Sequence, residues 1–202
     1  MVNVNLIIRR ALAVVLLSML SLGFLSISAA PKKQVQKIKV ACVGNSITYG
    51  TGIEDREHFS YPVQLQKMLG EKYQVGNFGK PGATLLNHGH RPYMQQEEFK
   101  EAMAFKGDIA VIHLGINDTD PRNWPNYRDE FVKDYLSLMD SLRSANPKVR
   151  FILARMTPIA DRHPRFISGT KLWHGEIQEA IQTVARVSGA ELIDFHAPLY
   201  PY

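Results

Sequence analysis

The regular alternation of short apolar runs with longer amphipathic stretches is the feature that most constrains how this chain can fold. Five nearly apolar runs are predicted to be strands: Ile38–Val43, Tyr73–Phe78, Ile109–Leu114, Val149–Leu153 and Glu191–Phe195. Apolar residues recur at helical spacing in four stretches: Tyr61–Leu69, Phe99–Phe105, Tyr127–Ala145 and Leu172–Val187. Strands that are apolar throughout are buried on both faces, so the sequence predicts a three-layer α/β/α domain with a five-stranded parallel sheet.

The N-terminal residues have a different composition. Two arginines precede an uncharged apolar run from Ala11 to about Ile27, and small residues follow up to Ala30. This order predicts a secretory signal peptide over residues 1–30, a connector over 31–37, and export to the periplasm or the extracellular space. An uncleaved membrane anchor is the alternative, because the apolar run is about long enough to span a bilayer.

The net charge of +5 is confined to the N-terminal part of the chain. Residues 1–39 carry six basic and no acidic residues, which leaves 18 basic against 19 acidic residues in the remainder. A nucleic-acid partner would need a basic face on the folded domain, so none is expected. No stable membrane partner is expected unless the signal segment stays uncleaved. Cys42 is the only cysteine, which excludes an intramolecular disulfide, and its apolar neighbours predict a buried core residue.

Three candidate motifs follow the first three predicted strands. Ser46 lies just past the first strand, where its backbone N–H can face a developing negative charge. The surrounding sequence lacks the lysine of a P-loop, the glycine spacing of a dinucleotide site and the last glycine of Gly-x-Ser-x-Gly. A serine that merely caps a helix is the simple alternative.

The other two motifs contain Gly82 and Asn117. Gly82 can offer its N–H to an oxyanion, although taken alone this motif is better explained by a simple Pro-Gly turn. Asn117 can donate from its side-chain amide, with an Asx turn as the alternative, and Asp118 is expected to order the loop rather than act as a base. Ligands bind at the carboxyl ends of parallel strands, so together with Ser46 the motifs predict a nucleophile and three oxyanion donors.

These motifs resemble those of the SGNH hydrolases, also called the GDSL esterase/lipase family. Gly44–Ile47 resembles the nucleophile block, Gly82 the second-block glycine, and Gly115–Asp118 the Gly-x-Asn-Asp block. The resemblance covers residues 38–202 and implies a flavodoxin-like sheet and a serine esterase with Ser46 as nucleophile. It implies no metal and no organic cofactor.

The stretches 115–125 and 168–174 look like those of bacterial carbohydrate O-acetylesterases, including sialate O-acetylesterases and acetylxylan esterases. This implies a glycan ester as substrate, with a lipase or thioesterase of the same family as the alternative. Arg155, Trp124 and Trp173 are candidates for binding the sugar, because aromatic rings stack on sugars and arginine pairs with carboxylates. Alternatively, Trp173 packs at the start of a helix and the arginines are solvated.

The family's final block, Asp-x-x-His, follows the fifth strand, and no such block follows Glu191–Phe195 in these 202 residues. Because a serine hydroxyl needs an adjacent base, we expect a C-terminally incomplete domain that is inactive in this form, or a carbohydrate-binding domain without turnover. His113 is predicted to be a satisfied core histidine. His88 and His90 are candidates for reaching the site or binding a metal. The remaining histidines are expected in surface or substrate loops: His58, His163, His174 and His196.

Overall fold

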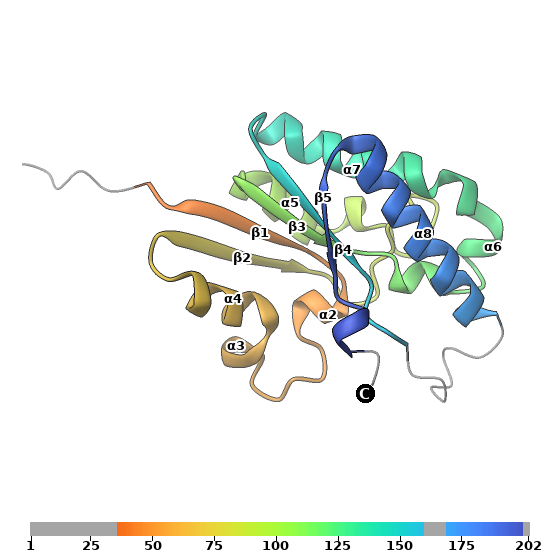
Figure 1. Cartoon of the computed structure of the whole chain (residues 1–202), viewed down its shortest axis with the longest axis horizontal. Helices are drawn as coiled ribbons and strands as arrows, with labels where there is room; N and C mark the ends of the chain where they lie inside the picture. The colour runs from red at the N-terminus through yellow and green to blue at the C-terminus, as the bar shows by residue number, and fades with distance from the viewer. Residues whose placement is uncertain (1–35, 160–168, 200–202) are drawn as a thin grey trace, which may run out of the picture. The chain divides into compact units, whose positions relative to one another are not determined.

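The computed structural model describes residues 36–159 and 169–199, so the predicted signal peptide lies outside the described residues. Five strands form one sheet in the described part: β1 Ile38–Gly44, β2 Tyr73–Gly79, β3 Ile109–His113, β4 Arg150–Arg155 and β5 Glu191–Asp194. All neighbouring strands are parallel, and their order is β2-β1-β3-β4-β5 (Figure 1). The predicted five-stranded parallel sheet is therefore confirmed, with strand ends that differ by one or two residues.

The longer helices also follow the predicted stretches. They are α4 Tyr61–Leu69, α5 Glu97–Phe105, α7 Phe131–Ala145 and α8 Thr170–Ser188. The predicted helix 127–145 begins later, since α6 Trp124–Tyr127 and the 3₁₀ turn η4 Arg128–Glu130 precede it. The remaining short elements are α2 Ser46–Tyr49, α3 Arg56–Phe59, η2 Tyr93–Gln95, η3 Ile116–Thr119 and η6 Ala197–Leu199. None of the helices in residues 36–159 and 169–199 is long and apolar enough to cross a membrane.

Helices cover both faces of the sheet, as Figure 1 shows. On one face, α5, α7 and α8 bury the larger core, in which Ile112 of the sheet packs with Leu138 and Ile177. On the other face, α4 packs against a smaller core around Val111 and the buried Cys42, as expected for that cysteine. Alternate residues of a strand point to opposite faces, which is why neighbouring positions of these strands enter different cores.

The strand order brings the three candidate motifs to one edge of the sheet. β1 lies between β2 and β3, and its last residue Gly44 is paired with Gly79 of β2 and His113 of β3. The chain leaving β1 and the chain leaving β3 therefore start side by side. The strand order reverses its direction here, and open α/β sheets bind their ligands at such a switch point.

Candidate active site

Ser46 is the first residue of the short helix α2 and is half-buried. The residue before it, Asn45, is the N-cap, and the Asn45 side-chain oxygen accepts a hydrogen bond from the N–H of Ile47 at 3.0 Å. The capping role that competed with a nucleophilic role for Ser46 is therefore filled by its neighbour. The Ser46 hydroxyl stands directly past the carboxyl end of β1.

Gly82 lies in the loop that follows β2. Its φ of +78° belongs to the left-handed region, which glycine adopts without the steric cost of a side chain. The loop is tied to the end of β1, because the N–H of Lys80 donates to the carbonyl of Gly44 at 2.9 Å. This bond brings the Gly82 turn close to the segment that carries Ser46.

Asn117 lies in η3, directly after β3, and only 3% of it is exposed. Its side-chain nitrogen donates to the backbone carbonyl of Ala83 at 2.8 Å. This bond fixes the orientation of the amide next to Gly82. One hydrogen bond thus links Asn117, which follows β3, to the residue next to Gly82, which follows β2.

The next residue, Asp118, orders the same loop, as expected from the sequence. Its carboxylate is fully buried and accepts hydrogen bonds from the N–H groups of Leu85 and Leu86, each at 2.9 Å. Burial raises the pKa of Asp118 to about 7, despite these bonds. Asp118 is therefore placed to hold two loops together and makes no contact that would make it a base for Ser46.

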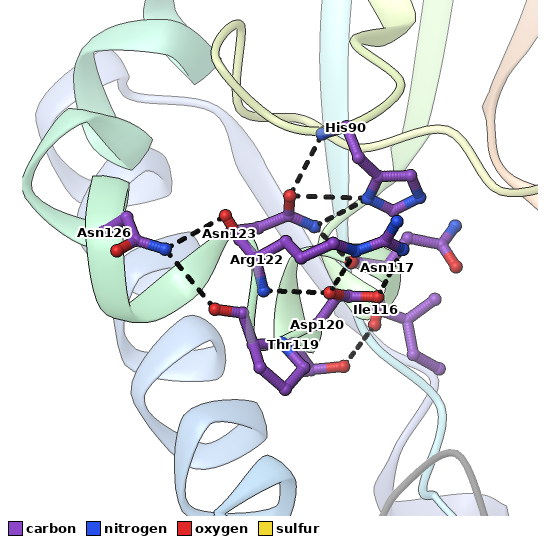
Figure 2. A network of polar contacts seen from close by, with 9 residues as sticks. His90, Ile116, Asn117, Thr119, Asp120, Arg122, Asn123 and Asn126 are labelled. Carbon is purple, nitrogen blue, oxygen red and sulfur yellow. Dashed lines mark hydrogen bonds and ion pairs between the residues drawn. The ribbon is translucent and has the colours of Figure 1, made fainter.

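A polar network continues outward from Asn117, and Figure 2 shows its members. Asn123 is fully buried and bonds both to the backbone of Asn117 and to His90. Arg122 pairs with Asp120 through two hydrogen bonds of 2.8 Å, which lower the pKa of Asp120 to about 2. Sequence reasoning did not identify Asn123. The signal that could have found it is the cluster of polar residues in the loop that directly follows Asn117.

The three sugar-binding candidates have different surroundings. Trp124 is 3% exposed and packs edge-to-face against Phe131, so its ring lies in the core rather than on the surface expected for a sugar-binding residue. Trp173 is half-buried and packs against the larger core at the start of α8, as its alternative interpretation states. Arg155 remains a candidate at the end of β4, where it pairs with Asp194 at 2.8 Å.

The buried histidines correct two expectations. His113 is a core residue, but neither of its ring nitrogens has a hydrogen-bond partner among the described residues, so it is not satisfied. Burial lowers the pKa of His113 to about 4. His174 is 6% exposed rather than a surface residue, and its Nε2 lies 2.9 Å from the carbonyl of Thr157. His163 lies outside the described residues.

The exposed histidines include two that form pairs with carboxylates. His58 pairs with Asp55 at 2.9 Å, and His88 pairs with Glu130 at 2.7 Å, with both imidazoles 67% exposed. Across residues 36–159 and 169–199, no histidine is hydrogen-bonded to the Ser46 hydroxyl. The same ranges contain no group of three or more histidine, cysteine, aspartate or glutamate side chains arranged to hold a metal ion.

A parallel α/β sheet that presents a serine, a glycine and an asparagine at the carboxyl ends of three adjacent strands has the architecture of a serine ester hydrolase. The family model described as "GDSL-like Lipase/Acylhydrolase family" matches residues 42–202. The chain belongs to this family, whose members are carboxylic ester hydrolases of the SGNH type.

One curated relative is an acetylxylan esterase of Xylanibacter ruminicola. The two sequences are 40% identical over 187 residues, which is 83% of this chain. The match covers 38% of the relative, so this chain spans well under half of that protein's length.

Solved structures share the fold at lower sequence identity. An acetyl xylan esterase named AlAXEase has 19% identity and a TM-score of 0.60, with 82% of this chain and 81% of that chain covered. A putative arylesterase from Agrobacterium tumefaciens has 19% identity and a TM-score of 0.63, with 79% and 83% covered. Est24, a carbohydrate acetylesterase from Sinorhizobium meliloti, has 19% identity and a TM-score of 0.58, with 78% and 84% covered.

Proposed function

We propose that the protein removes acetyl groups from an O-acetylated carbohydrate, with Ser46 as the nucleophile. The hydrogen bond from Asn117 to Ala83 is the observation that carries the proposal, because it brings the Asn117 amide to the Gly82 turn. The tie from Lys80 to Gly44 brings the same turn to the segment of Ser46. The 40% identical acetylxylan esterase supports xylan over sialic acid as the acetylated carbohydrate.

In this proposal, the Ser46 hydroxyl oxygen attacks the acetyl carbonyl carbon, and the carbonyl electrons move onto the oxygen. The backbone N–H groups of Ser46 and Gly82 and the amide of Asn117 stabilise that oxyanion. One such donor contributes roughly 3–4 kcal/mol in the transition state. The intermediate collapses and expels the sugar oxygen, which takes up a proton, and water then hydrolyses the acetyl-serine to release acetate.

The proton of Ser46 must pass to a base in the first step and return to the sugar oxygen in the second. In the family this base is the histidine of the Asp-x-x-His block after the fifth strand, and no such block follows β5 in these 202 residues. Full turnover is therefore proposed for a form of the protein that carries such a block. Export through the predicted signal peptide would place the enzyme where polymeric xylan is found.

Hydrolysis of p-nitrophenyl acetate and release of acetate from acetylated xylan, measured on a form of the protein that carries the Asp-x-x-His block, test the proposal. Ser46→Ala is expected to abolish both reactions without changing the fold measured by circular dichroism. Ser144→Ala is the matched control, because Ser144 lies on the exposed side of α7. Equal rates in the wild type and in Ser46→Ala would refute Ser46 as the nucleophile.

A second candidate is binding of acetylated glycans without turnover. It is favoured by one observation, namely that no histidine is hydrogen-bonded to Ser46 in the described ranges. Calorimetric titration with acetylated xylo-oligosaccharides separates the two candidates. Binding that is not followed by acetate release supports the second candidate, while acetate release that depends on Ser46 excludes it.

A further inference from the structure

The side chain of Asn123 is a buried clamp between two loops. Its oxygen accepts a hydrogen bond from the backbone N–H of His90 at 3.0 Å, and its nitrogen donates to the backbone carbonyl of Asn117 at 2.9 Å. A backbone N–H can only donate and a carbonyl can only accept. These two partners therefore fix which end of the Asn123 amide is oxygen and which is nitrogen.

The same amide determines the tautomer of the His90 ring. The Asn123 nitrogen lies 3.0 Å from Nδ1 of His90, whereas the Asn123 oxygen lies 3.4 Å from it. An amide nitrogen can only donate, so Nδ1 of His90 must be the acceptor in the shorter contact. The neutral ring then carries its hydrogen on Nε2. Both hydrogens of the Asn123 amide are used, one for Asn117 and one for His90.

This tautomer gives His90 a defined role. With Nδ1 occupied and a hydrogen on Nε2, the neutral ring has no lone pair with which to take a proton from Ser46. It does have an N–H to donate, and the residue is exposed. His90 is thus a hydrogen-bond donor rather than the replacement base that the sequence left open.

The Asn123 amide holds the His90 ring beside the loop that carries Asn117. Figure 2 shows this ring beside Asn117 and the Asp120–Arg122 pair. Sugars offer hydroxyl and ring oxygens to such a donor.

We propose that His90 binds the carbohydrate part of the substrate by donating its Nε2–H to a sugar oxygen, and that Asn123 is the positioning residue that fixes this tautomer. The inference rests on the proposed function of the site. It assigns His90 to substrate specificity rather than to the acyl transfer itself. Variants of His90 should therefore change the KM for carbohydrate esters and leave kcat nearly unchanged.

Nitrogen-15 NMR of the histidine rings tests the tautomer without any need for turnover. At slightly alkaline pH, where imidazoles are neutral, His90 of the wild type is expected as the Nε2–H form. Asn123→Asp places a carboxylate at the clamp and is expected to move the hydrogen to Nδ1. A wild-type ring with its hydrogen on Nδ1 would overturn the inference.

Kinetics with two replacements test the role in binding. A glutamine side chain can place an N–H near the position of Nε2, whereas asparagine reaches only the position of Nδ1. His90→Asn is expected to raise the KM for acetylated xylo-oligosaccharides roughly 3- to 10-fold, as expected for one lost hydrogen bond, and His90→Gln is expected to restore it. p-Nitrophenyl acetate has no sugar, so its KM should not change.

His88→Asn is the matched control, since His88 lies two residues away in the same loop and pairs with Glu130. If the protein binds the oligosaccharides without turnover, dissociation constants from calorimetry should follow the same order as the KM values. A KM or dissociation constant that is unaltered in His90→Asn would refute the inference. Because Ser46→Ala is assayed separately on both substrates, this failure would leave the proposed esterase function standing.

Discussion

Replacing His113 by leucine is expected to stabilise the protein and to remove much of its loss of stability in mild acid. His113 is fully buried at the end of β3, with its ring 5.5 Å from that of Phe195. Neither ring nitrogen has a hydrogen-bond partner among the described residues. A buried polar group without a partner costs about 1–3 kcal/mol, which an apolar side chain of similar size would recover at neutral pH.

The pH dependence follows from the pKa of the same ring. Burial lowers the pKa of His113 from 6.5 to about 4, because the charged ring would lose its hydration. The unfolded chain therefore binds this proton before the folded protein does. The stability linked to His113 is fully present above about pH 6.5 and is lost as the pH falls to about 4. At about 1.4 kcal/mol per pH unit, the loss amounts to roughly 3 kcal/mol.

Urea unfolding of the wild type and of His113→Leu over this pH range measures both effects. The difference in unfolding free energy between the two proteins should grow by roughly 3 kcal/mol as the pH falls, since other titrating groups contribute equally to both. His88→Leu is the control, because that imidazole is 67% exposed. Parallel profiles for the wild type and His113→Leu would refute the reasoning.

Three further predictions concern the segment after β3. Asp118→Asn should remove a loss of stability that the wild type shows as the pH rises from about 4 to about 7, because burial raises the pKa of Asp118 to about 7. An unfolding free energy that changes with pH equally in both proteins, measured by urea unfolding, would contradict this. Gly115→Ala should lower stability by roughly 2–4 kcal/mol, because φ is +122° and the new Cβ would lie 2.9 Å from Ile177. Calorimetry should show a lower Tm. An unchanged Tm would exclude backbone strain and steric overlap at this position. In a form that carries the Asp-x-x-His block, Asn117→Ala should lower kcat for p-nitrophenyl acetate by roughly 100-fold or more with little change in KM. A loss below about tenfold would exclude an oxyanion role.

Much of the fold could be predicted from the sequence because each strand is a short apolar run, separated from the next by a helical stretch or a loop. The four longer helices and five strands of the described residues lie where the periodicity predicts them. The start of α7 was missed, because the apolar spacing continues through Tyr127 while the backbone turns through η4. Periodicity reports which side chains are buried and does not report such a local change of helix type.

The site was predictable only as a set of motifs. Ser46, Gly82 and Asn117 each follow a strand, and parallel strands place such residues at one edge. The burial of Trp124 could not be predicted, because an aromatic residue in a polar loop can either face solvent or pack inward. Its edge contact with Phe131, the first residue of α7, places it in the core.

The sequence by itself determined the α/β class, the family and the positions of the three motif residues, because these depend on local periodicity and short patterns. Only the tertiary structure decided that Asn45 rather than Ser46 caps α2, that His113 is buried without a partner among the described residues, and that Asn123 joins two loops. The bond between His90 and Asn123 joins segments that lie 33 residues apart in the chain. Burial and partner choice of this kind arise when the chain is folded, and no short stretch of sequence contains them.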